Sequence, residues 1–383
     1  MSVRADVAVV GGGLSGTAAA VAAAAAGLTT VHFAPPAPPD RRTSALMLPS
    51  IAFLTEAGLI ADAAAIGTPL AQIRIIDATR RLVRAGETLF EAGEFGFEAF
   101  GYNIANSALL KAFGVRAASF DNLTVVAAPA GGLAREAQRF SLEADGQRYS
   151  ASVLVGADGR QSGVRAFAGI GARVHPFEQA ALVADLSLER PLGQCSVEFH
   201  YENGPFTLVP AGGARANLVW IDRRGALDAA RERAALEAAI LEKTSRLFGA
   251  ASVTAGPHIF DLASLTADSA AAPGIVLVGE AAHAFPPIGA QGLNIGLRDV
   301  AELGRLALAA TPADADWATR LSAGYAAARR ADVARTGLMV DTLFRSLISG
   351  LLPADLARSA GMMALRNIAP LRRTAFETGM GRR

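Results

Sequence analysis

Asp6-Val7-Ala8-Val9-Val10-Gly11-Gly12-Gly13-Leu14-Ser15-Gly16 is the stretch that decides the fold of this 383-residue chain. Its valines favour a buried parallel strand, and the alanine-rich run from Thr17 to Ala26 favours a helix. Between them, Gly11-x-Gly13-x-x-Gly16 permits a tight turn, close approach of a phosphate to the backbone, and close helix–strand packing. With a further strand from Thr29 to Phe33, the pattern predicts a dinucleotide-binding βαβ unit.

The composition is that of a large folded protein. Hydrophobic residues make up 51% of the chain and charged residues 19%, which is enough to bury a core and too apolar for disorder. The net charge of +1 argues against a nucleic-acid partner. The single cysteine, Cys195, excludes an internal disulfide, and the scattered histidines predict no metal site. With so little cysteine, a reducing cytoplasm is the expected location. Residues 7–39 carry no charge, but glycines and prolines interrupt them, so we expect no membrane span there.

Further along the chain, a helix–strand alternation frames an antiparallel middle. Strands are expected at 73–77, 81–85, 182–189, 196–201, 206–209 and 216–221, and helices at 102–113, 229–248 and 292–310. The predicted fold class is α/β, with a Rossmann-like nucleotide-binding domain, an inserted antiparallel-sheet substrate domain and C-terminal helices. We place the nucleotide-binding domain at 1–75, 100–180 and 255–325, the sheet domain at 76–99 and 181–254, and the helical segment at 326–383.

Two later motifs also follow predicted strands. One runs from Leu154 to Arg165 and delivers an Asp158-Gly159 turn. The other is GEAAHAFPPIGAQGLNIGLRD at 279–299, in which the Glu280 carboxylate can bind a hydroxyl group and the new helix presents N–H groups to an anion. Asp158 and Glu280 have an alternative role as helix caps, and His283 is expected to be a structural histidine.

Taken in order, the three motifs resemble those of the class A FAD-dependent monooxygenases, which are aromatic hydroxylases. The stretches DRRTSAL (40–46), GYNI (101–104), GPFTLVP (204–210) and LVW (218–220), with the tail at 341–344, 370–373 and 379–381, resemble the ubiquinone-biosynthesis branch. The resemblance implies bound FAD, NAD(P)H as co-substrate, and O2 activated as a flavin C4a-hydroperoxide. It implies hydroxylation of an aromatic substrate, a polyprenylated phenol of ubiquinone biosynthesis. Such chemistry needs no obligatory nucleophile, so no catalytic residue is singled out.

The resemblance also implies where FAD is bound. The three glycines of the first motif would hold the pyrophosphate, Arg42 the adenine-dinucleotide half, and Glu280 the ribityl chain. Asp158 and Gly159 would lie near the pyrophosphate and the approach of NAD(P)H, and residues 287–294 would line the flavin ring. The full set of cofactor-binding residues is Gly11, Gly13, Leu14, Ser15, Gly16, Arg42, Asp158, Gly159, Gly279, Glu280, Pro287, Gly289, Ala290, Gln291, Gly292, Leu293 and Asn294.

Several positions depart from the family pattern. No acid ends the second strand, which moves the expected ribose contact to Asp40, Arg41 or Arg42. The family usually has aspartate in place of Glu280 and glycine in place of Ala290, and often arginine in place of Ser107. These departures keep open a catalytically silent scaffold of a quinone-synthesis complex. Another alternative is a hydroxylase of a soluble aromatic or secondary metabolite.

The tail is the last informative stretch. Val340, Leu343, Phe344 and Leu347 recur at helical spacing. One interpretation is a C-terminal helical pair packed on the FAD-binding domain. The other is a surface for peripheral contact with the inner face of a membrane or with a ubiquinone complex, and burial against another subunit in an oligomer is also open.

Overall fold

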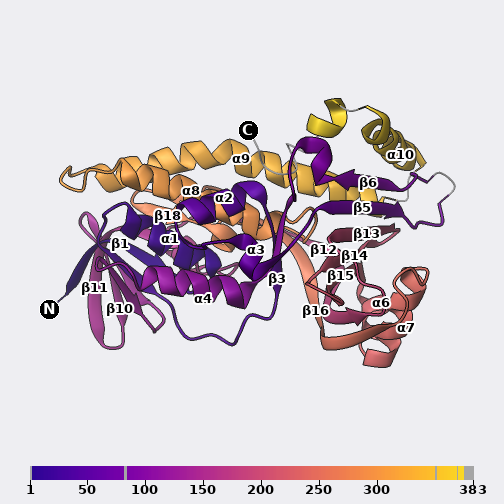
Figure 1. Cartoon of the computed structure of the whole chain (residues 1–383). Coiled ribbons are helices and arrows are strands. Elements are labelled where there is room, and N and C mark those ends of the chain that lie inside the picture. Colours follow the sequence, from indigo (N-terminus) through magenta and orange to yellow (C-terminus); the bar gives the residue numbers. More distant parts are fainter. Residues whose placement is uncertain (1, 82–83, 350–351, 369, 375–383) are drawn as a thin grey trace.

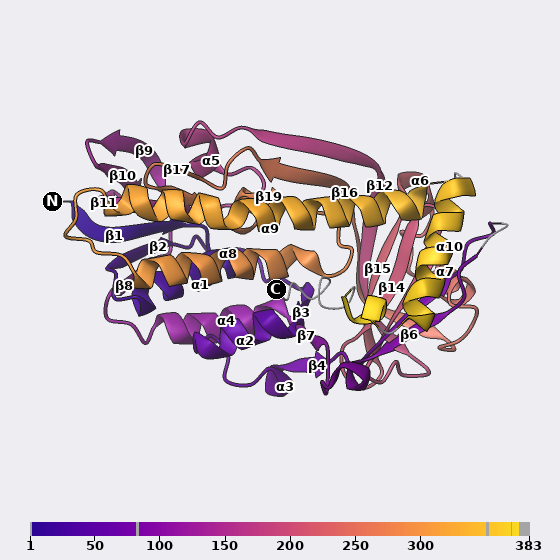
Figure 2. The same ribbon diagram turned by 90° about the horizontal axis from the view of Figure 1, so that it is seen from above.

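The computed structural model describes residues 2–81, 84–349, 352–368 and 370–374. It contains two eight-stranded sheets and a three-stranded sheet, with helices packed against them (Figure 1). The first eight-stranded sheet lies in the part of the molecule that holds the N-terminus, and the second lies beside the C-terminal helix. Long helices and strands extend between these two parts (Figure 2). This mixture of helices and sheets confirms the predicted α/β class.

The first sheet is built around β1 (Val3–Val10), in the order β17-β18-β11-β1-β2-β8, with β10 and β9 joined to β11. Its other strands are β2 (Thr30–Phe33), β8 (Leu123–Val126), β9 (Gly131–Glu136), β10 (Arg139–Ala144), β11 (Gln147–Gly156), β17 (Ala271–Ala272) and β18 (Ile275–Leu277). Strand β11 runs parallel to both β1 and β18. The three glycine-containing motifs follow these three strands, so they meet at one edge of the sheet.

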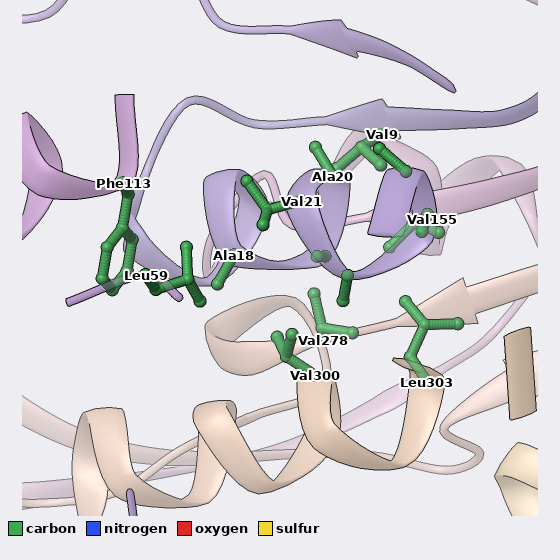
Figure 3. Packing of buried hydrophobic residues seen from close by; sticks show 14 of the residues in the cluster. Val9, Ala18, Ala20, Val21, Leu59, Phe113, Val155, Val278, Val300 and Leu303 are labelled. Atoms are coloured by element: carbon green, nitrogen blue, oxygen red, sulfur yellow. The ribbon is translucent and has the colours of Figure 1, made fainter. Parts of the chain in front are cut away.

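Small side chains let the helices pack closely on this sheet. Helix α1 (Leu14–Ala25) packs against α4 (Asn106–Ala117) and α8 (Gln291–Leu308). Figure 3 shows Ala18 and Val21 of α1 near Val278 and Val300, in a cluster that Leu59 and Phe113 extend. The alanine-rich run of α1 is therefore buried within this core.

The three-stranded sheet corrects one prediction. Its order is β3 (Thr43–Met47), β7 (Gly101–Ala105), β4 (Gly67–Pro69), and α2 (Leu48–Glu56) and α3 (Ala63–Ile66) adjoin it. The helix predicted at 102–113, with its start after Asn103, begins later, because β7 pairs there with strands on both sides. The helix begins only at Asn106.

The second eight-stranded sheet has the order β19-β16-β12-β15-β14-β13-β5-β6. Its strands are β5 (Gln72–Asp77), β6 (Thr88–Glu91), β12 (Ala172–Leu188), β13 (Cys195–Tyr201), β14 (Gly204–Pro210), β15 (Arg215–Arg223), β16 (Ala251–Ala267) and β19 (His283–Ala284). Neighbouring strands run antiparallel, whereas β13 and β5 run parallel. One face packs on α6 (Arg224–Ala229) and α7 (Arg233–Lys243) through a core that includes Leu182, Phe206, Trp220 and Leu236.

Three predictions in this region need correction. The helix expected at 229–248 is shorter at both ends: α7 covers only 233–243, and α6 ends at Ala229, where the chain turns. Residues 81, 84 and 85 lie in a loop and not in a strand, and 82–83 lie outside the described residues. Strand β16 was not predicted, and β12 starts ten residues before the expected position at 182, since the two pair with each other along their whole length.

Two C-terminal helices complete the fold. Helix α9 (Trp317–Ile348) contacts β17 and β18 of the first sheet and β13 and β14 of the second. Helix α10 (Leu352–Asn367) lies beside β5 and β6 (Figure 1). Within the described parts of the chain, no helix is both long enough and apolar enough to cross a bilayer.

Candidate functional site

The turn between β1 and α1 is closed by the packing of two glycines. Gly11 has φ +125°, and a Cβ there would lie 2.2 Å from the Ala157 carbonyl oxygen. A Cβ on Gly16 would lie 1.9 Å from the Gly11 carbonyl oxygen. Both positions therefore require glycine for close backbone contact. Gly13 differs, because no atom lies within 4 Å of the position its Cβ would take.

Gly13 belongs to a set of glycines that leave the backbone open. Gly159, Gly289 and Gly292 likewise have no atom within 4 Å of the position of an added Cβ. They flank the starts of α1, α5 (Gly163–Phe167) and α8, at the edge where the three motifs meet. Neither α1 nor α8 has a side-chain cap. Their first N–H groups and positive dipole ends are thus suited to an anion such as a pyrophosphate.

Ser15 joins two of these motifs. An added Cβ would lie 2.8 Å from the Ser15 Oγ at Gly279 and 2.9 Å from it at Gly296. The serine side chain thus fits between the turn after β18 and the first turns of α8. Leu14 beside it is buried, so the predicted residues Leu14 and Ser15 pack inside the protein. Their side chains therefore hold the motifs together.

The second motif is fixed by Asp158. Its carboxylate accepts hydrogen bonds from the Ser162 hydroxyl at 2.5 Å and the Val164 amide at 3.1 Å. Ser162 caps α5 by accepting from the Arg165 amide, and the Arg165 guanidinium donates to the Ala281 carbonyl at 2.9 Å. Asp158 therefore orders the loop that starts α5, whose N-cap is Ser162, and Gly159 remains open beside it.

The third motif begins at η2 (Gly279–Ala281), where Glu280 is exposed. Its carboxylate lies 3.4 Å from the Arg160 guanidinium. Hydrogen bonds to Asp40, the charge of Asp40 and then the charge of Glu280 raise the pKa of Arg42, although burial opposes them. Glu280, Arg160 and Arg42 thus form a charged rim beside the open glycines.

Asp40 holds Arg42 in place. Arg42 donates two side-chain hydrogen bonds to Asp40, at 2.9 and 2.8 Å, and Asn106 donates another at 2.9 Å. Burial alone would raise the pKa of Asp40, but these bonds outweigh it and lower that pKa to about 2. Asp40 is therefore ionised at neutral pH and is already paired, which leaves the exposed Arg42 as the outer group of the rim.

The start of α8 carries most of the remaining predicted residues. Pro287, Gly289 and Gly292 are exposed, and Leu293 is half-buried. Ala290 is the N-cap in the left-handed region, with φ +54°. The buried Gln291 donates to the Gly289 carbonyl at 3.0 Å.

Asn294 has a structural role in this arrangement. Its amide accepts from the Met47 N–H at 3.0 Å and from the Ser50 hydroxyl at 2.7 Å. It also donates to the carbonyls of Ala45 at 2.8 Å and Ala290 at 2.5 Å. The side chain of this predicted site residue is thus saturated by protein partners, and it fixes β3 and α2 against the start of α8.

A buried ionic network supports η2 from behind. The Asp299 carboxylate accepts from the Gly279 amide at 2.9 Å, from His283 Nε2 at 2.7 Å and from Arg329 Nε at 2.7 Å. The side chains of Asp299 and His283 are each 1% exposed and that of Arg329 is 2% exposed. His283 is therefore held in the core, as expected of a structural histidine.

Sequence reasoning missed a second polar network. Asn217 on β15 accepts from the Thr43 hydroxyl at 3.0 Å and from the Asn103 amide at 2.8 Å, and it donates to Asp185 at 2.7 Å. The network joins the three-stranded sheet to the second eight-stranded sheet. Thr43 and Asn103 fall inside the stretches quoted above at 40–46 and 101–104, which was the available signal.

Comparisons with known proteins agree with this geometry. A family model described as FAD binding domain matches residues 4–336. The ubiquinone hydroxylase UbiL of Rhodospirillum rubrum is 34% identical over 98% of this chain and 90% of its own length. The 3-demethoxyubiquinol 3-hydroxylase of Escherichia coli is 30% identical over 62% of this chain and 61% of its own length.

A solved structure shows the same fold. The p-nitrophenol 4-monooxygenase PnpA of Pseudomonas putida superposes with a TM-score of 0.81 at 16% identity, and the match covers 100% of both chains. The open glycines, two uncapped helix starts and charged rim lie within the residues that the family model matches. The chain therefore belongs to the FAD-binding domain family, as an FAD-dependent monooxygenase of its ubiquinone-hydroxylase branch.

Proposed function

We propose that this protein uses FAD, NAD(P)H and O2 to hydroxylate the ring of a polyprenylated phenol in ubiquinone biosynthesis. The relatives named as ubiquinone hydroxylases support the reaction class and the pathway. The observation that carries the proposal is the open backbone of Gly13, Gly159, Gly289 and Gly292 beside the uncapped starts of α1 and α8. A dinucleotide can approach the main chain there, where side chains would block it.

Each predicted residue has a proposed task at this site. The turn at 11–16 and the N–H groups of α1 would hold the pyrophosphate, with Arg42 at the adenine half. Glu280 would accept hydrogen bonds from the ribityl chain. The start of α8 would bring N–H groups and a positive dipole end to the flavin ring, which favours a negative charge on the reduced ring. Bound FAD supplies the activated oxygen, and the protein orients the aromatic ring and excludes water.

We further propose the division of the chain predicted from the sequence, in which the sheet domain at 76–99 and 181–254 binds the substrate. Its face opposite α6 and α7 supports this. At one side of that face, Ile288 of the flavin-site loop packs with Ala181 and Ile221. At the other side, Asn217 binds Thr43 of the three-stranded sheet. The strip between these two anchors would hold the aromatic ring.

The strip consists of half-buried side chains in register. Val183 pairs with Val219, Val219 with Thr207, Thr207 with Glu198, and Glu198 with Ile75. These partners share one face, because their chain neighbours Leu182, Leu218, Phe206, Leu208, Val197 and Phe199 all point into the opposite core. The strip is mainly apolar, which suits an aromatic ring and the first part of an isoprenoid chain.

The prenyl chain would leave the strip under α10. Ile75 pairs with Thr88 of β6, and Thr88 lines a cavity of about 240 Å³ together with Met362 and Met363 of α10. The guanidinium of Arg372 lies 4.3 Å above the Phe90 ring, which seats the end of the helical tail on β6. Leu356, Met363, Ile368 and Leu371 are exposed there. This apolar surface supports peripheral contact with a membrane that supplies the substrate.

The test is a mass-spectrometric profile of quinone lipids in the source cell with the gene deleted. Accumulation of an under-hydroxylated prenyl-phenol that the intact gene clears supports the proposal, and its mass identifies the missing step. A Gly13→Asp variant places a carboxylate against the pyrophosphate and must fail to clear the intermediate. Clearance by that variant, expressed as a folded protein without FAD, would favour a silent scaffold. An unchanged profile in a cell without a second hydroxylase would favour a soluble aromatic substrate.

A further inference from the structure

An ionic pair on β13 faces the proposed ring site. His200 Nε2 lies 2.6 Å from Glu198 Oε1, and the two side chains are 13% and 24% exposed. They lie on the face opposite the core that holds Val197 and Phe199, because alternate residues of a strand point to opposite sides. The pair is thus half-buried on the substrate face of the second sheet, away from the FAD-binding motifs.

The register places the pair at a defined point of this face. Glu198 lies in the strip, between Thr207 and Ile75. His200 lies two residues farther along β13, and its partner on β14 is Pro205. This level continues toward Ile221, which packs with Phe344 and Leu347 of α9. The pair thus sits where the strip meets the cover formed by α9.

Two neighbouring charged groups have hydrogen-bond partners of their own. Asp77 is in register with His200 on β5, and it accepts hydrogen bonds from Thr79 and Ala85. The Arg81 guanidinium donates to the Leu347 carbonyl at the end of α9.

Farther out, the helices covering this face hold their own ion pairs. On the tail that follows α10, Arg372 pairs with Glu94, and on α9 Arg345 pairs with Asp341. Histidine is the side chain best suited to exchange a proton near neutral pH, and a carboxylate partner orients it and stabilises its charged form.

We propose that His200, oriented by Glu198, is the base that ionises the phenol of the substrate. With its proton on Nε2 and donated to Glu198, His200 keeps a lone pair on Nδ1. The phenol O–H bond breaks and an N–H bond forms at Nδ1, while the oxygen keeps the electron pair. The phenolate has more electron density at its ortho and para carbons, where an electrophilic oxygen is accepted. The imidazolium formed is held by the Glu198 carboxylate. His200 is thus a catalytic residue and Glu198 a positioning residue, in an inference that rests on the proposed function.

The experiment uses the FAD-loaded protein and a prenylated 4-nitrophenol, whose phenolate absorbs at longer wavelength than its phenol. His200→Gln and Glu198→Gln are compared with the wild type, and His175→Gln is the matched control at an exposed histidine far along β12. The FAD spectrum and thermal unfolding verify that each variant is folded. If one variant of the pair is unfolded, the other still tests the proposal.

Two readouts are expected to change together. His200→Gln should raise the pKa of the bound nitrophenol by about one to three pH units, because it removes the group that becomes a cation beside the phenolate. It should also lower kcat about 10²-fold or more below that pKa, with recovery at higher pH, where the phenolate is already present. Glu198→Gln should shift both readouts in the same direction by less, and His175→Gln should shift neither.

The outcomes separate the two proposals. A wild-type protein that neither binds nor hydroxylates the prenylated probe overturns the proposed function and this inference with it. A wild type that hydroxylates the probe, with folded pair variants that keep its pH profile and the pKa of the bound phenol, overturns only the role of His200 and Glu198. A uniform loss of kcat at every pH, without a shift in the bound pKa, also overturns it, because that pattern marks a structural role.

Discussion

Removing the charge of Asp299 should destabilise the protein by about 3 kcal/mol or more. Asp299→Asn keeps one carbonyl oxygen, which can still accept from Arg329, but its amide NH2 replaces the oxygen that binds His283 and the Gly279 N–H. Two hydrogen bonds to a buried charge are lost at about 1.5 kcal/mol or more each. This agrees with the cost of about 3–5 kcal/mol for breaking a buried ion pair.

The assay is urea unfolding of the FAD-free protein, with Asp341→Asn as the matched control. Asp341 pairs with Arg345 at 2.7 Å on the exposed surface of α9, so its loss should cost about 0.5 kcal/mol or less. Asp299→Asn should also loosen η2, because the Gly279 amide loses its acceptor. A loss below about 1 kcal/mol in Asp299→Asn would refute the reasoning, since it would mean that the buried charge contributes little.

The effect of Asp299→Asn on the free energy of unfolding should also depend on pH. Burial would raise the pKa of Asp299, but His283, Arg329 and the Gly279 amide together lower it. A carboxyl group with a lowered pKa in the folded state stabilises the protein above the unfolded pKa, about 3.9. That contribution is lost as the pH falls through the folded pKa. The difference in unfolding free energy between wild type and Asp299→Asn should therefore narrow in acid.

Three further predictions concern the glycine motifs and their surroundings. Gly16→Ala should destabilise the protein by about 1–3 kcal/mol in urea unfolding, since its Cβ would lie 1.9 Å from a carbonyl oxygen. Gly13→Ala, where the added Cβ meets no atom, should keep that stability and weaken FAD binding in a titration. Ala290→Gly should stabilise the protein by up to about 1 kcal/mol in urea unfolding, because Ala290 holds φ +54°, and no gain would contradict this. Burial lowers the pKa of His32, so stability should fall as the pH drops below about 6.5, and His32→Gln should flatten that slope; an equal slope would contradict it.

Local patterns predicted the nucleotide-binding edge well. Strand β1 and helix α1 follow from residues close in sequence, and the parallel order of β1, β11 and β18 brings the three motifs together. The architecture and the family predicted from these motifs are confirmed. The individual FAD contacts stay predictions, although the open positions at Gly13 and Gly292 favour them.

Contacts between distant residues were beyond the sequence patterns. Asn294 looked like a ligand residue, but its four partners lie on β3, α2 and the loop before its own helix. Strand β16 lacks a strong alternation of apolar and polar residues, and it is a strand because it pairs with β12. No local motif marks the Glu198–His200 pair. The face of the sheet on which the two side chains lie is set by the pairing of β13 with its neighbours, which the sequence does not reveal.

The long elements also limit how the two eight-stranded sheets can move relative to one another. Helix α9 has 32 residues and spans about 48 Å. The paired strands β12 and β16 of the second sheet run beside it toward the first sheet (Figure 2). These three long elements resist bending, so we expect no hinge motion between the two eight-stranded sheets. We expect any opening to come from local movements where α10 lies beside β5 and β6 (Figure 1). The two sheets would then keep one relative orientation, and only the end of the molecule beside α10 would open to a ligand.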